Sequence, residues 1–397
     1  MNHTLLFVAW DGASLQYIQG LFLPILRGLQ PHGYKIKVLH ASWANKHVVQ
    51  RLQADLAKEG IGYVPIQIKR QFSIIGTLYS LWLMERTLKH MLQAGDITHL
   101  MPRSTLPGLI TWRLRRLIKK QDIQLIFDAD GLPLEERLDF AGLSPQSRQY
   151  RFLKRKEGQV IQLTDKVLTR SQKAIEHHAA ILGEGIKTKC FVVSNGRDTN
   201  VFHYSESARV MIRKDLGISA DTLLFIYVGS LGPQYGWEEM VQIVQATQKK
   251  QACAWLILTA QQDYALSRLS ADLQAITQVM TVAPDAVPDY LSAADIAFAI
   301  RDPKPSMIGV APIKLGEYLL LGLPTIASNG IGDTEVLLKD FDQVHLFNHK
   351  QTDRIEHVIT FVQNIKLSAA ERMRISQKAA PVFSLAASIN AYLKALN

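Results

Sequence analysis

Short apolar runs alternate with amphipathic stretches along the whole chain. Apolar runs of this length are typical of parallel strands that are buried on both faces. We expect such strands at 5–9, 36–39, 63–66, 98–101, 125–127, 167–171, 224–228, 255–259, 279–283, 295–300 and 325–327. Between them, apolar residues at helical spacing predict helices, including those at 46–59, 76–93 and 107–120. The alternation favours an α/β fold built from doubly wound, Rossmann-like units.

Length and composition narrow the class of protein further. A chain of 397 residues, 47% of them apolar, is long enough for two domains with separate cores. No apolar run is long enough to span a bilayer, and the run at 3–10 is too short, and too soon followed by Asp11, to be a signal peptide. Cys190 and Cys253 have neither ligand nor redox spacing, so we expect packed thiols in a reducing compartment. Together these features predict a cytoplasmic protein.

The formal net charge of +10 comes entirely from the first half of the chain. Such a surface suits nucleic acid, anionic lipid or a diphosphate-linked acceptor, and a solvated basic face stays open as the alternative. No motif for reading nucleic acid is present, so we expect no nucleic-acid partner. The helix at 107–120 carries the basic residues Arg113, Arg115, Arg116, Lys119 and Lys120. In and before the helix at 76–93, Trp82 and its apolar neighbours are flanked by Lys69, Arg70, Arg86 and Lys89. We expect these two helices either to cover the core or to make peripheral contact with an anionic membrane.

The most informative stretch is 301–328, RDPKPSMIGVAPIKLGEYLLLGLPTIAS. It predicts a loop rich in Gly and Pro, a helix with Pro312 in its first turn, and a strand after Gly322. A helix N-terminus at the carboxyl end of a strand binds anions, and with Lys314 beside it we interpret the anion as a diphosphate. Glu317 follows at i+3 and is suited to accept hydrogen bonds from a ribose diol. The alternative is an exposed Lys–Glu pair on an ordinary helix.

A second phosphate cradle is expected after the strand at 224–228. The loop there contains several glycines just before a helix, and such a loop leaves backbone N–H groups open toward a ligand. Its residues are Gly229, Ser230, Gly232 and Gly236. Because this chain has no lysine or arginine in the loop, we expect Lys314 and Arg301 to meet the charge of the diphosphate.

In the first half, polar residues follow the predicted strands at the edge where parallel strands end. The candidates are Asp11, Gly12 and Ser14 after the first strand, Arg103 after the strand at 98–101, and Asp128 and Asp130 after the strand at 125–127. The first loop lacks the G-x-G-x-x-G dinucleotide fingerprint, and an ordinary Asp-Gly turn is its alternative reading. We expect the two carboxylates after 125–127 to face a crevice rather than the core.

The 301–328 stretch resembles the donor-site segment of retaining glycosyltransferases of family 4, especially bacterial members that build capsular and other surface polysaccharides. The likeness is carried by Ser306, Pro312, Lys314, Glu317, Tyr318, Gly322 and Pro324. The segment VVSNGRDTNVF at 192–202 is similar to the segment that joins the two domains in that family. The resemblance covers most of the chain and is weaker in the first half.

This resemblance implies a GT-B fold, with two Rossmann-like domains that face a central cleft. An acceptor-binding domain is expected at 1–200 and a donor-binding domain at 201–377, with a helix at 378–397 packed back on the first. The implied reaction moves a hexose from a nucleotide-diphosphate sugar to a glycan or lipid-linked acceptor, with retention and without a metal or another cofactor. The resemblance also implies that the reaction takes place in the cytoplasm, at the inner face of the membrane.

The implied catalytic residues are Glu317, Lys314 and Asp130. The donor site is expected to include the glycine loop, Arg301 and the start of the donor helix, namely Ser306, Gly309, Pro312 and Ile313. The acceptor side is expected to use the polar residues that follow the strands of the first domain.

Four positions depart from the family pattern. Ser230 and Tyr235 stand where relatives often carry Arg and Lys, Asp130 stands where they often carry His or Arg, and Gly309 stands where the better-known pattern has a glutamate. A catalytically silent member, which binds a nucleotide sugar within a polysaccharide assembly complex, therefore stays open. A nucleotide-sugar epimerase of related fold is a further alternative, although KLGEY at 314–318 is similar to the transferase version.

Overall fold

The computed structural model describes residues 3–69 and 73–397, which form two compact units. Unit 1 comprises Met1–Val193 and Ser388–Asn397, and unit 2 comprises Ser194–Ala387. The sequence placed the boundaries after residues 200 and 377, so residues 194–200 and 378–387 fall in unit 2 rather than in unit 1. Arg70, which we named beside the aromatic helix, lies outside the described residues.

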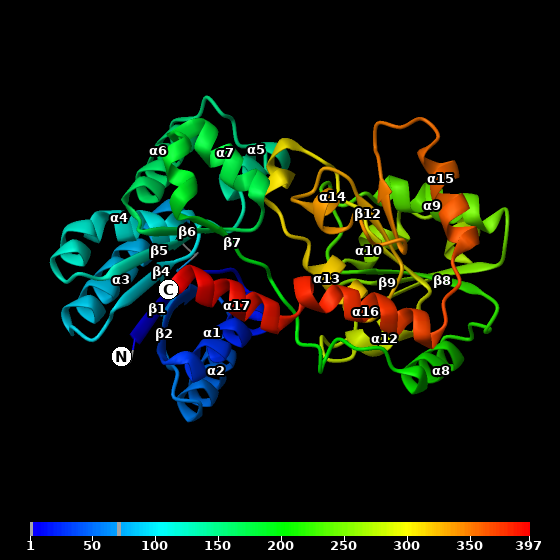
Figure 1. The fold of residues 1–397 in the computed structure, drawn as a ribbon, viewed down its shortest axis with the longest axis horizontal. Helices are drawn as coiled ribbons and strands as arrows, with labels where there is room; N and C mark the ends of the chain where they lie inside the picture. Colours follow the sequence, from blue (N-terminus) through cyan, green and yellow to red (C-terminus); the bar gives the residue numbers. More distant parts are fainter. Residues whose placement is uncertain (1–2, 70–72) are drawn as a thin grey trace. The chain divides into compact units, whose positions relative to one another are not determined.

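Unit 1 is built on a seven-stranded sheet whose paired strands all run parallel (Figure 1). The strand order is β3-β2-β1-β4-β5-β6-β7. The strands are β1 His3–Trp10, β2 Tyr34–Ser42, β3 Gly62–Gln67, β4 His99–Pro102, β5 Gln124–Asp128, β6 Lys166–Thr169 and β7 Cys190–Val192. We expected no strand between 167–171 and 224–228, which would make 167–171 the last strand of this sheet, and that was wrong. The pattern missed β7 because it is a three-residue edge strand with no fully buried side chain.

Helices join these strands and cover the sheet. They are the π-helix η1 Ile18–Phe22, α1 Leu23–Leu29, the 3-10 helix η2 Gln30–His32, α2 Lys46–Lys58, α3 Ser73–Gln93, α4 Thr105–Lys120, α5 Pro133–Phe140, α6 Arg148–Leu163, α7 Gln172–Leu182 and the 3-10 helix η3 Glu184–Lys189. The inner faces of α3 and α4 supply Met84, Leu88 and Ile110 to a core shared with β1 and β4. This is the burial that the helical spacing of the apolar residues predicts.

Unit 2 is built on a six-stranded parallel sheet with the order β10-β9-β8-β11-β12-β13. The strands are β8 Leu223–Val228, β9 Cys253–Leu258, β10 Thr277–Met280, β11 Ile296–Ala299, β12 Thr325–Ser328 and β13 Val344–Phe347. One hydrophobic cluster lies on each face of the sheet, and Tyr318 and Trp255 are large side chains of the two clusters. Both units therefore confirm the predicted α/β fold of two Rossmann-like, parallel-sheet domains.

The helices of unit 2 follow the same alternation. They are α8 Glu206–Asp215, α9 Trp237–Gln248, α10 Gln262–Leu266, α11 Ala271–Gln274, α12 Val287–Ala293, the 3-10 helix η4 Pro305–Gly309, α13 Ile313–Leu320, α14 Thr334–Leu337, α15 Arg354–Asn364 and α16 Ala369–Phe383. The predicted end of α13 is confirmed at Gly322, which has φ 67°. A Cβ at this glycine would lie 2.1 Å from the carbonyl oxygen of Arg372, so no other residue fits there.

The carboxyl-terminal stretch, expected as one helical tail, is broken into α16 and α17 Leu385–Leu396. The break lies at Ser384, which forms an isolated parallel bridge with Arg197. The amide of Arg197 donates to the carbonyl of Phe383 at 2.9 Å, and the amide of Leu385 donates to the carbonyl of Arg197 at 2.7 Å. The two chain segments that join the units thus run side by side within unit 2.

Both cysteines are free thiols, and burial raises the pKa of Cys190 and of Cys253 to about 11, as expected for packed residues. Within residues 3–69 and 73–397, no helix has the length and apolar character needed to cross a membrane.

Candidate functional site

In unit 2, Lys314 lies in an aromatic cage at the start of α13. Its Nζ is 2.9 Å from the hydroxyl of Tyr227 and 4.4 Å from the ring centroids of both Tyr227 and Tyr235. Gly229 makes room for the chain of Lys314, because a Cβ there would lie 2.7 Å from Lys314 Cε. Pro312 is the N-cap of α13 and gives it no side-chain cap, so the first N–H groups of the helix stay open to a ligand.

The electrostatic setting of Lys314 favours an anion. Burial, and secondly the positive charge of Arg301, lower the pKa of Lys314 to about 7, while Glu317 acts in the opposite direction. A lysine held in this way gains its full charge when a phosphate binds next to it. The predicted role of Lys314 as a phosphate ligand therefore has a physical basis in this cage.

Arg301 is the second cation of the same cage. It follows β11, and its amide donates to Ser328 Oγ at 2.8 Å. Its guanidinium lies 4.9 Å from the ring centroid of Tyr235, and the two residues form an isolated bridge. Tyr235, where the family resemblance led us to expect a lysine, packs against both cations instead of adding a third charge.

Glu317 has a partner that the sequence did not suggest. Arg197 Nη2 lies 2.9 Å from Glu317 Oε1, and the side chain of Glu317 is only 12% exposed. Burial raises the pKa of Glu317, while Arg197 and Lys314 counteract that rise. Arg197 belongs to the VVSNGRDTNVF segment, which we interpreted only as the link between the two domains. The positive charge of Arg197 was the one feature of the sequence that could have indicated a partner for Glu317.

The other predicted donor residues lie around this cage to different degrees. Ser230 is exposed, and its carbonyl accepts a hydrogen bond from the hydroxyl of Tyr227. Gly232 has φ 148° in the same loop, and Ile313 is the first residue of α13. Ser306 and Gly309, by contrast, are buried in η4, so that segment offers a ligand less side-chain surface than we expected.

In unit 1, charged residues gather at the carboxyl ends of the central strands. Arg103 Nη2 lies 2.5 Å from Asp130 Oδ2, and its Nη1 lies 3.6 Å from Asp11 Oδ1. These residues follow β4, β5 and β1, which are neighbours or near neighbours in the sheet. The sequence-based grouping of Asp11, Arg103 and Asp130 thus corresponds to one cluster in space.

Asp128 does not face outward as expected. Its side chain is completely buried and pairs with Arg170 Nη2 at 2.7 Å, and its Oδ1 accepts the amide of Asp130 at 3.1 Å. The next strand, β6, delivers Arg170 directly beside it, so Asp128 neutralises a buried cation. Asp130, which adopts φ 54°, is the carboxylate of this turn that keeps some exposure, and burial raises its pKa against the effect of Arg103.

Three further residues of the cluster were not predicted. The side chain of His40 bridges Asp11 and Tyr63, at 3.0 Å from Asp11 Oδ2 and 2.7 Å from the tyrosine hydroxyl. Tyr392 of α17 is buried, and burial raises its pKa above the ordinary range beside Arg170. Each of these side chains comes from a different element, so no local pattern links them.

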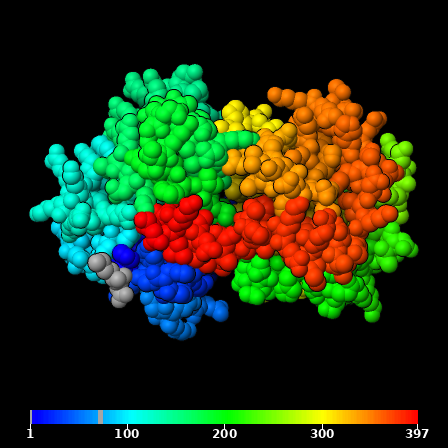
Figure 2. Space-filling view, viewed as in Figure 1, coloured from blue at the N-terminus to red at the C-terminus, as the bar shows by residue number. Residues whose placement is uncertain are grey.

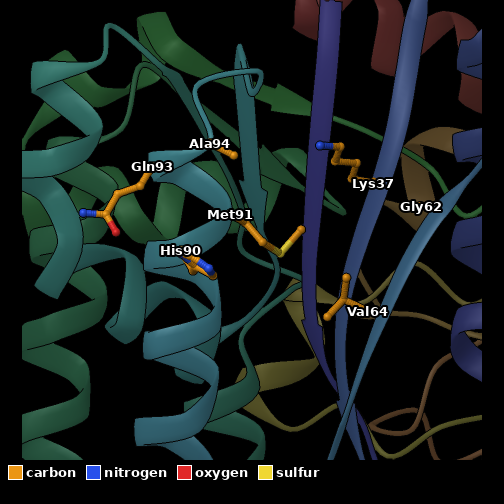
Figure 3. Close-up of a pocket in the computed structure, with 7 residues that line it drawn as sticks. All are labelled: Lys37, Gly62, Val64, His90, Met91, Gln93 and Ala94. Carbon is orange, nitrogen blue, oxygen red and sulfur yellow. The ribbon is translucent and has the colours of Figure 1, made fainter.

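The remaining predicted residues of the acceptor side form the first loop. Ser14 is exposed and its Oγ accepts the amide of Gln16 at 3.1 Å, while the ring of Trp43 lies beside Gly12. The hollow drawn in Figure 3 is a different place, lined by residues of β2, β3 and the end of α3. It has a volume of about 570 Å³ and is lined by Lys37, Gly62, Val64, His90, Met91, Gln93 and Ala94, none of them a predicted site residue.

The two parallel-sheet, Rossmann-like units match the GT-B architecture of solved glycosyltransferase structures. Within unit 2, residues 209–380 match the family described as glycosyl transferases group 1. This match and the fold support a glycosyltransferase. No curated protein matches the chain.

Solved structures of the same fold include three with named ligands or activities. HepE of Anabaena, in complex with UDP and glucose, is 15% identical, with 99% of each chain covered and a TM-score of 0.70. Sucrose-phosphate synthase of Thermosynechococcus elongatus is 14% identical, with 99% of this chain and 98% of that chain covered and a TM-score of 0.73. The catalytic domain of starch synthase IV from Arabidopsis thaliana, bound to ADP and acarbose, is 13% identical, with 99% and 98% covered and a TM-score of 0.69. Likeness at these identities establishes the fold.

Proposed function

We propose that this protein is a retaining, metal-independent glycosyltransferase that moves a sugar from a nucleotide-diphosphate donor to a glycan or a lipid-linked acceptor. The observation that carries the proposal is the aromatic cage in unit 2. There Lys314 and Arg301 share the ring of Tyr235 next to the open N-terminus of α13. Two cations and unsatisfied helix N–H groups are what a diphosphate leaving group needs.

The proposed chemistry breaks the bond between the anomeric carbon and the phosphate oxygen of the donor. The nucleoside diphosphate leaves with the bonding electrons, and Lys314, Arg301 and the N–H groups of α13 stabilise its developing charge. The acceptor hydroxyl forms the new bond to the anomeric carbon, and its proton passes to the departing phosphate oxygen. No separate base is needed on this route.

Donor recognition is proposed to use Glu317 for the ribose hydroxyls. When it is ionised, the carboxylate of Glu317 is a strong acceptor for a diol, and Arg197 favours that form by opposing the rise of the Glu317 pKa that burial causes. The complexes of HepE with UDP and with UDP-glucose support a nucleotide-sugar donor for this fold. The structure of starch synthase IV with ADP leaves the base open.

The acceptor is proposed to bind unit 1 at the charged cluster, with Asp130 orienting its hydroxyl. Asp130 is partly exposed at the carboxyl end of β5, where ligands of parallel sheets bind. The proposed setting is surface polysaccharide synthesis, such as capsule, with the protein in the cytoplasm at the inner face of the membrane.

Calorimetric titration combined with a donor-hydrolysis assay on the same preparation tests the function. UDP-sugars and ADP-sugars are titrated in turn, and mass spectrometry of the soaked protein identifies the donor that is retained. We expect saturable binding of one donor, slow release of free sugar, and faster turnover with an acceptor. A protein that binds no nucleotide sugar would contradict the proposal.

A catalytically silent binder is the second candidate, and the Arg197–Glu317 pair is the observation that favours it. A carboxylate already neutralised by a partner is less available to a substrate, and Gly309 leaves the site without a second glutamate. A silent binder would take up the donor without any hydrolysis or transfer, so the same titration and assay separate the two candidates.

A further inference from the structure

Helix α3 presents an unusual outer face. Ile75, Leu78, Tyr79 and Trp82 are 73%, 59%, 44% and 51% exposed, although they are large apolar side chains. Their spacing of i, i+3, i+4 and i+7 places them on one stripe, opposite the buried Met84 and Leu88. Contiguous exposure of this kind marks an interaction surface, whereas single exposed apolar residues are ordinary.

Cations surround this apolar stripe. The Nζ of Lys69 lies 5.1 Å from the ring centroid of Tyr79, and the guanidinium of Arg86 lies 5.6 Å from that of Trp82. Further along the same face, Lys89 is exposed and has no ion-pair partner within the described part of the chain. The face is therefore apolar in its first two turns and cationic beyond them.

The stripe is held firmly on unit 1. Ser80 Oγ accepts the amide of Lys69 at 3.2 Å, and it donates to the carbonyl of Gly76 at 2.7 Å. Glu85 joins α3 to the basic helix α4 through Arg113, at 2.7 Å. The two helices form an outer part of unit 1, coloured cyan in Figure 2. A fixed helix with Lys69, Arg86 and Lys89 beside its apolar stripe can bind a surface without a folding step.

We propose that the outer face of α3 docks on an anionic membrane surface, with Ile75, Leu78, Tyr79 and Trp82 at the level of the lipid headgroups. Aromatic rings and aliphatic side chains favour that level, and the adjacent Lys and Arg side chains attract anionic headgroups. A second copy of this chain fits the surface poorly, because it would bring the same cations into contact and the chain carries a net charge of +10. This inference adds the docking element to the membrane setting of the proposed function, and it does not depend on the reaction.

Arg115 takes no part in this surface. Its guanidinium stacks on the ring of Trp112 at 4.2 Å and its Nη1 donates to the carbonyl of the same residue at 2.9 Å. Arg116 and Lys119, by contrast, are exposed on α4. A test of membrane contact therefore alters α3 and leaves Arg115 unchanged.

Co-sedimentation of the full chain with vesicles tests the docking. One set of vesicles is pure phosphatidylcholine, and the other contains an equal amount of phosphatidylglycerol. We expect binding to the anionic vesicles, with release at high salt because screening weakens the contacts of the cations. The double variant Leu78→Ser/Tyr79→Ser should lower the partition coefficient by roughly tenfold or more, since two large side chains lose their burial. The variant Arg86→Glu/Lys89→Glu should also lower the partition coefficient, but only on anionic vesicles, because it removes an electrostatic attraction.

Matched controls use equally exposed residues of unit 2. Val210→Ser/Met211→Ser on α8 removes a similar apolar pair, and Lys249→Glu/Lys250→Glu removes a similar charge pair. Both controls should leave the partition unchanged. Trp82→Phe adds a direct readout, because it should retain binding and abolish the shift of tryptophan fluorescence to shorter wavelength on docking.

Four results would overturn the docking proposal. The first is that the wild type does not bind anionic vesicles, and the second is that the partition coefficient falls equally in the α3 variants and in the controls. The third is a fluorescence shift that persists in Trp82→Phe. The fourth is a dimer, seen in sedimentation velocity, that dissociates in the α3 variants. Titration of the nucleotide-sugar donor in solution is run on each variant. Normal donor binding with failed docking would leave the proposed function intact.

Discussion

Arg197 Nη2 lies 2.9 Å from Glu317 Oε1, and this ion pair joins helix α13 to the segment where the chain passes from one unit to the other. The backbone of Arg197 also exchanges hydrogen bonds with Phe383 and Leu385, on the segment that leads back. The carboxylate proposed to hold the ribose is therefore fixed by a residue of the linker. A change of the linker conformation would reach Glu317 through this pair.

The first prediction concerns Glu317 itself. Glu317→Gln removes the charge and keeps the shape, so Gln still accepts a hydrogen bond from Arg197. We expect a folded protein that loses most turnover and binds the donor at least tenfold more weakly, since a hydrogen bond to a charged group is worth about 1.5–3 kcal/mol. Thermal unfolding checks the fold, the hydrolysis assay measures turnover, and calorimetric titration measures donor binding. Glu238→Gln on the exposed side of α9 is the matched control, and full activity of Glu317→Gln would remove this residue from the donor site.

The second prediction concerns Arg197, and it has a defined dependence on pH. Burial raises the pKa of Glu317, and Arg197 opposes that rise, so Arg197→Met should raise the pKa further. Below this pKa Glu317 is protonated and the lost partner matters little. As the pH rises through it, the variant holds an unpaired buried carboxylate, so its deficit in Tm relative to the wild type should grow with pH.

Donor binding gives the opposite check on the same pair. Donor binding should weaken as the pH is lowered, because Glu317 becomes protonated. In Arg197→Met this loss should occur at a higher pH than in the wild type, because the pKa of Glu317 is higher there. Arg197→Lys should restore the wild-type profile in part. Arg209→Met, which breaks a pair with Asp295 in the same unit, serves as the control. Tighter donor binding in Arg197→Met would mean that Arg197 competes with the ribose.

The third prediction follows from the cage around Lys314. Because its pKa is lowered to about 7, Lys314 is largely neutral above that pH, and an arriving diphosphate should draw a proton onto it. Calorimetric titrations of the nucleoside diphosphate in buffers of different ionisation enthalpy should therefore show net proton uptake above pH 7. Lys314→Ala should weaken binding of the diphosphate more than binding of the nucleoside.

Lys314→Arg is the control for the proton, since its side chain stays charged throughout this pH range. It should bind the diphosphate without proton uptake. Equal losses of nucleoside and diphosphate binding in Lys314→Ala, or uptake that persists in Lys314→Arg, would contradict the phosphate assignment.

The fourth prediction separates the two carboxylates that follow β5. Asp130→Asn should reduce transfer to the acceptor and leave slow hydrolysis of the donor, because Asp130 is the partly exposed one. Asp128→Asn should instead lower the free energy of unfolding by about 3 kcal/mol, because it leaves the guanidinium of Arg170 without its buried partner. Loss of both activities in a stable Asp130→Asn protein would indicate that Asp130 shapes the strand end rather than orienting the acceptor.

Local patterns sufficed for the framework of this protein. Strand β8 and both ends of helix α13 follow from short stretches of sequence: an apolar run, a proline and a glycine. Each of these features acts through backbone geometry or side-chain burial within a few residues. The same holds for the glycine loop and for the polar residues that follow the strands, since parallel strands of one sheet end at one edge. The short edge strands β7 and β13 were not predicted, because most of their side chains are only partly buried and the sequence there shows no clear apolar run.

The partners of the charged residues were decided only in three dimensions. Asp128 and Asp130 are almost adjacent in sequence, yet one is enclosed with Arg170 and the other reaches Arg103. Lys314 and Glu317 are one turn apart, yet the first lies between two tyrosines from the opening of unit 2 and the second meets Arg197. Apolar periodicity and turn residues act over a few positions along the chain, so the sequence by itself determined most strands of the two sheets and helix α13, which carries the proposed donor residues. The charge, protonation and exposure of each site residue depend on which distant strands and loops lie next to it, and only the tertiary structure decides those neighbours.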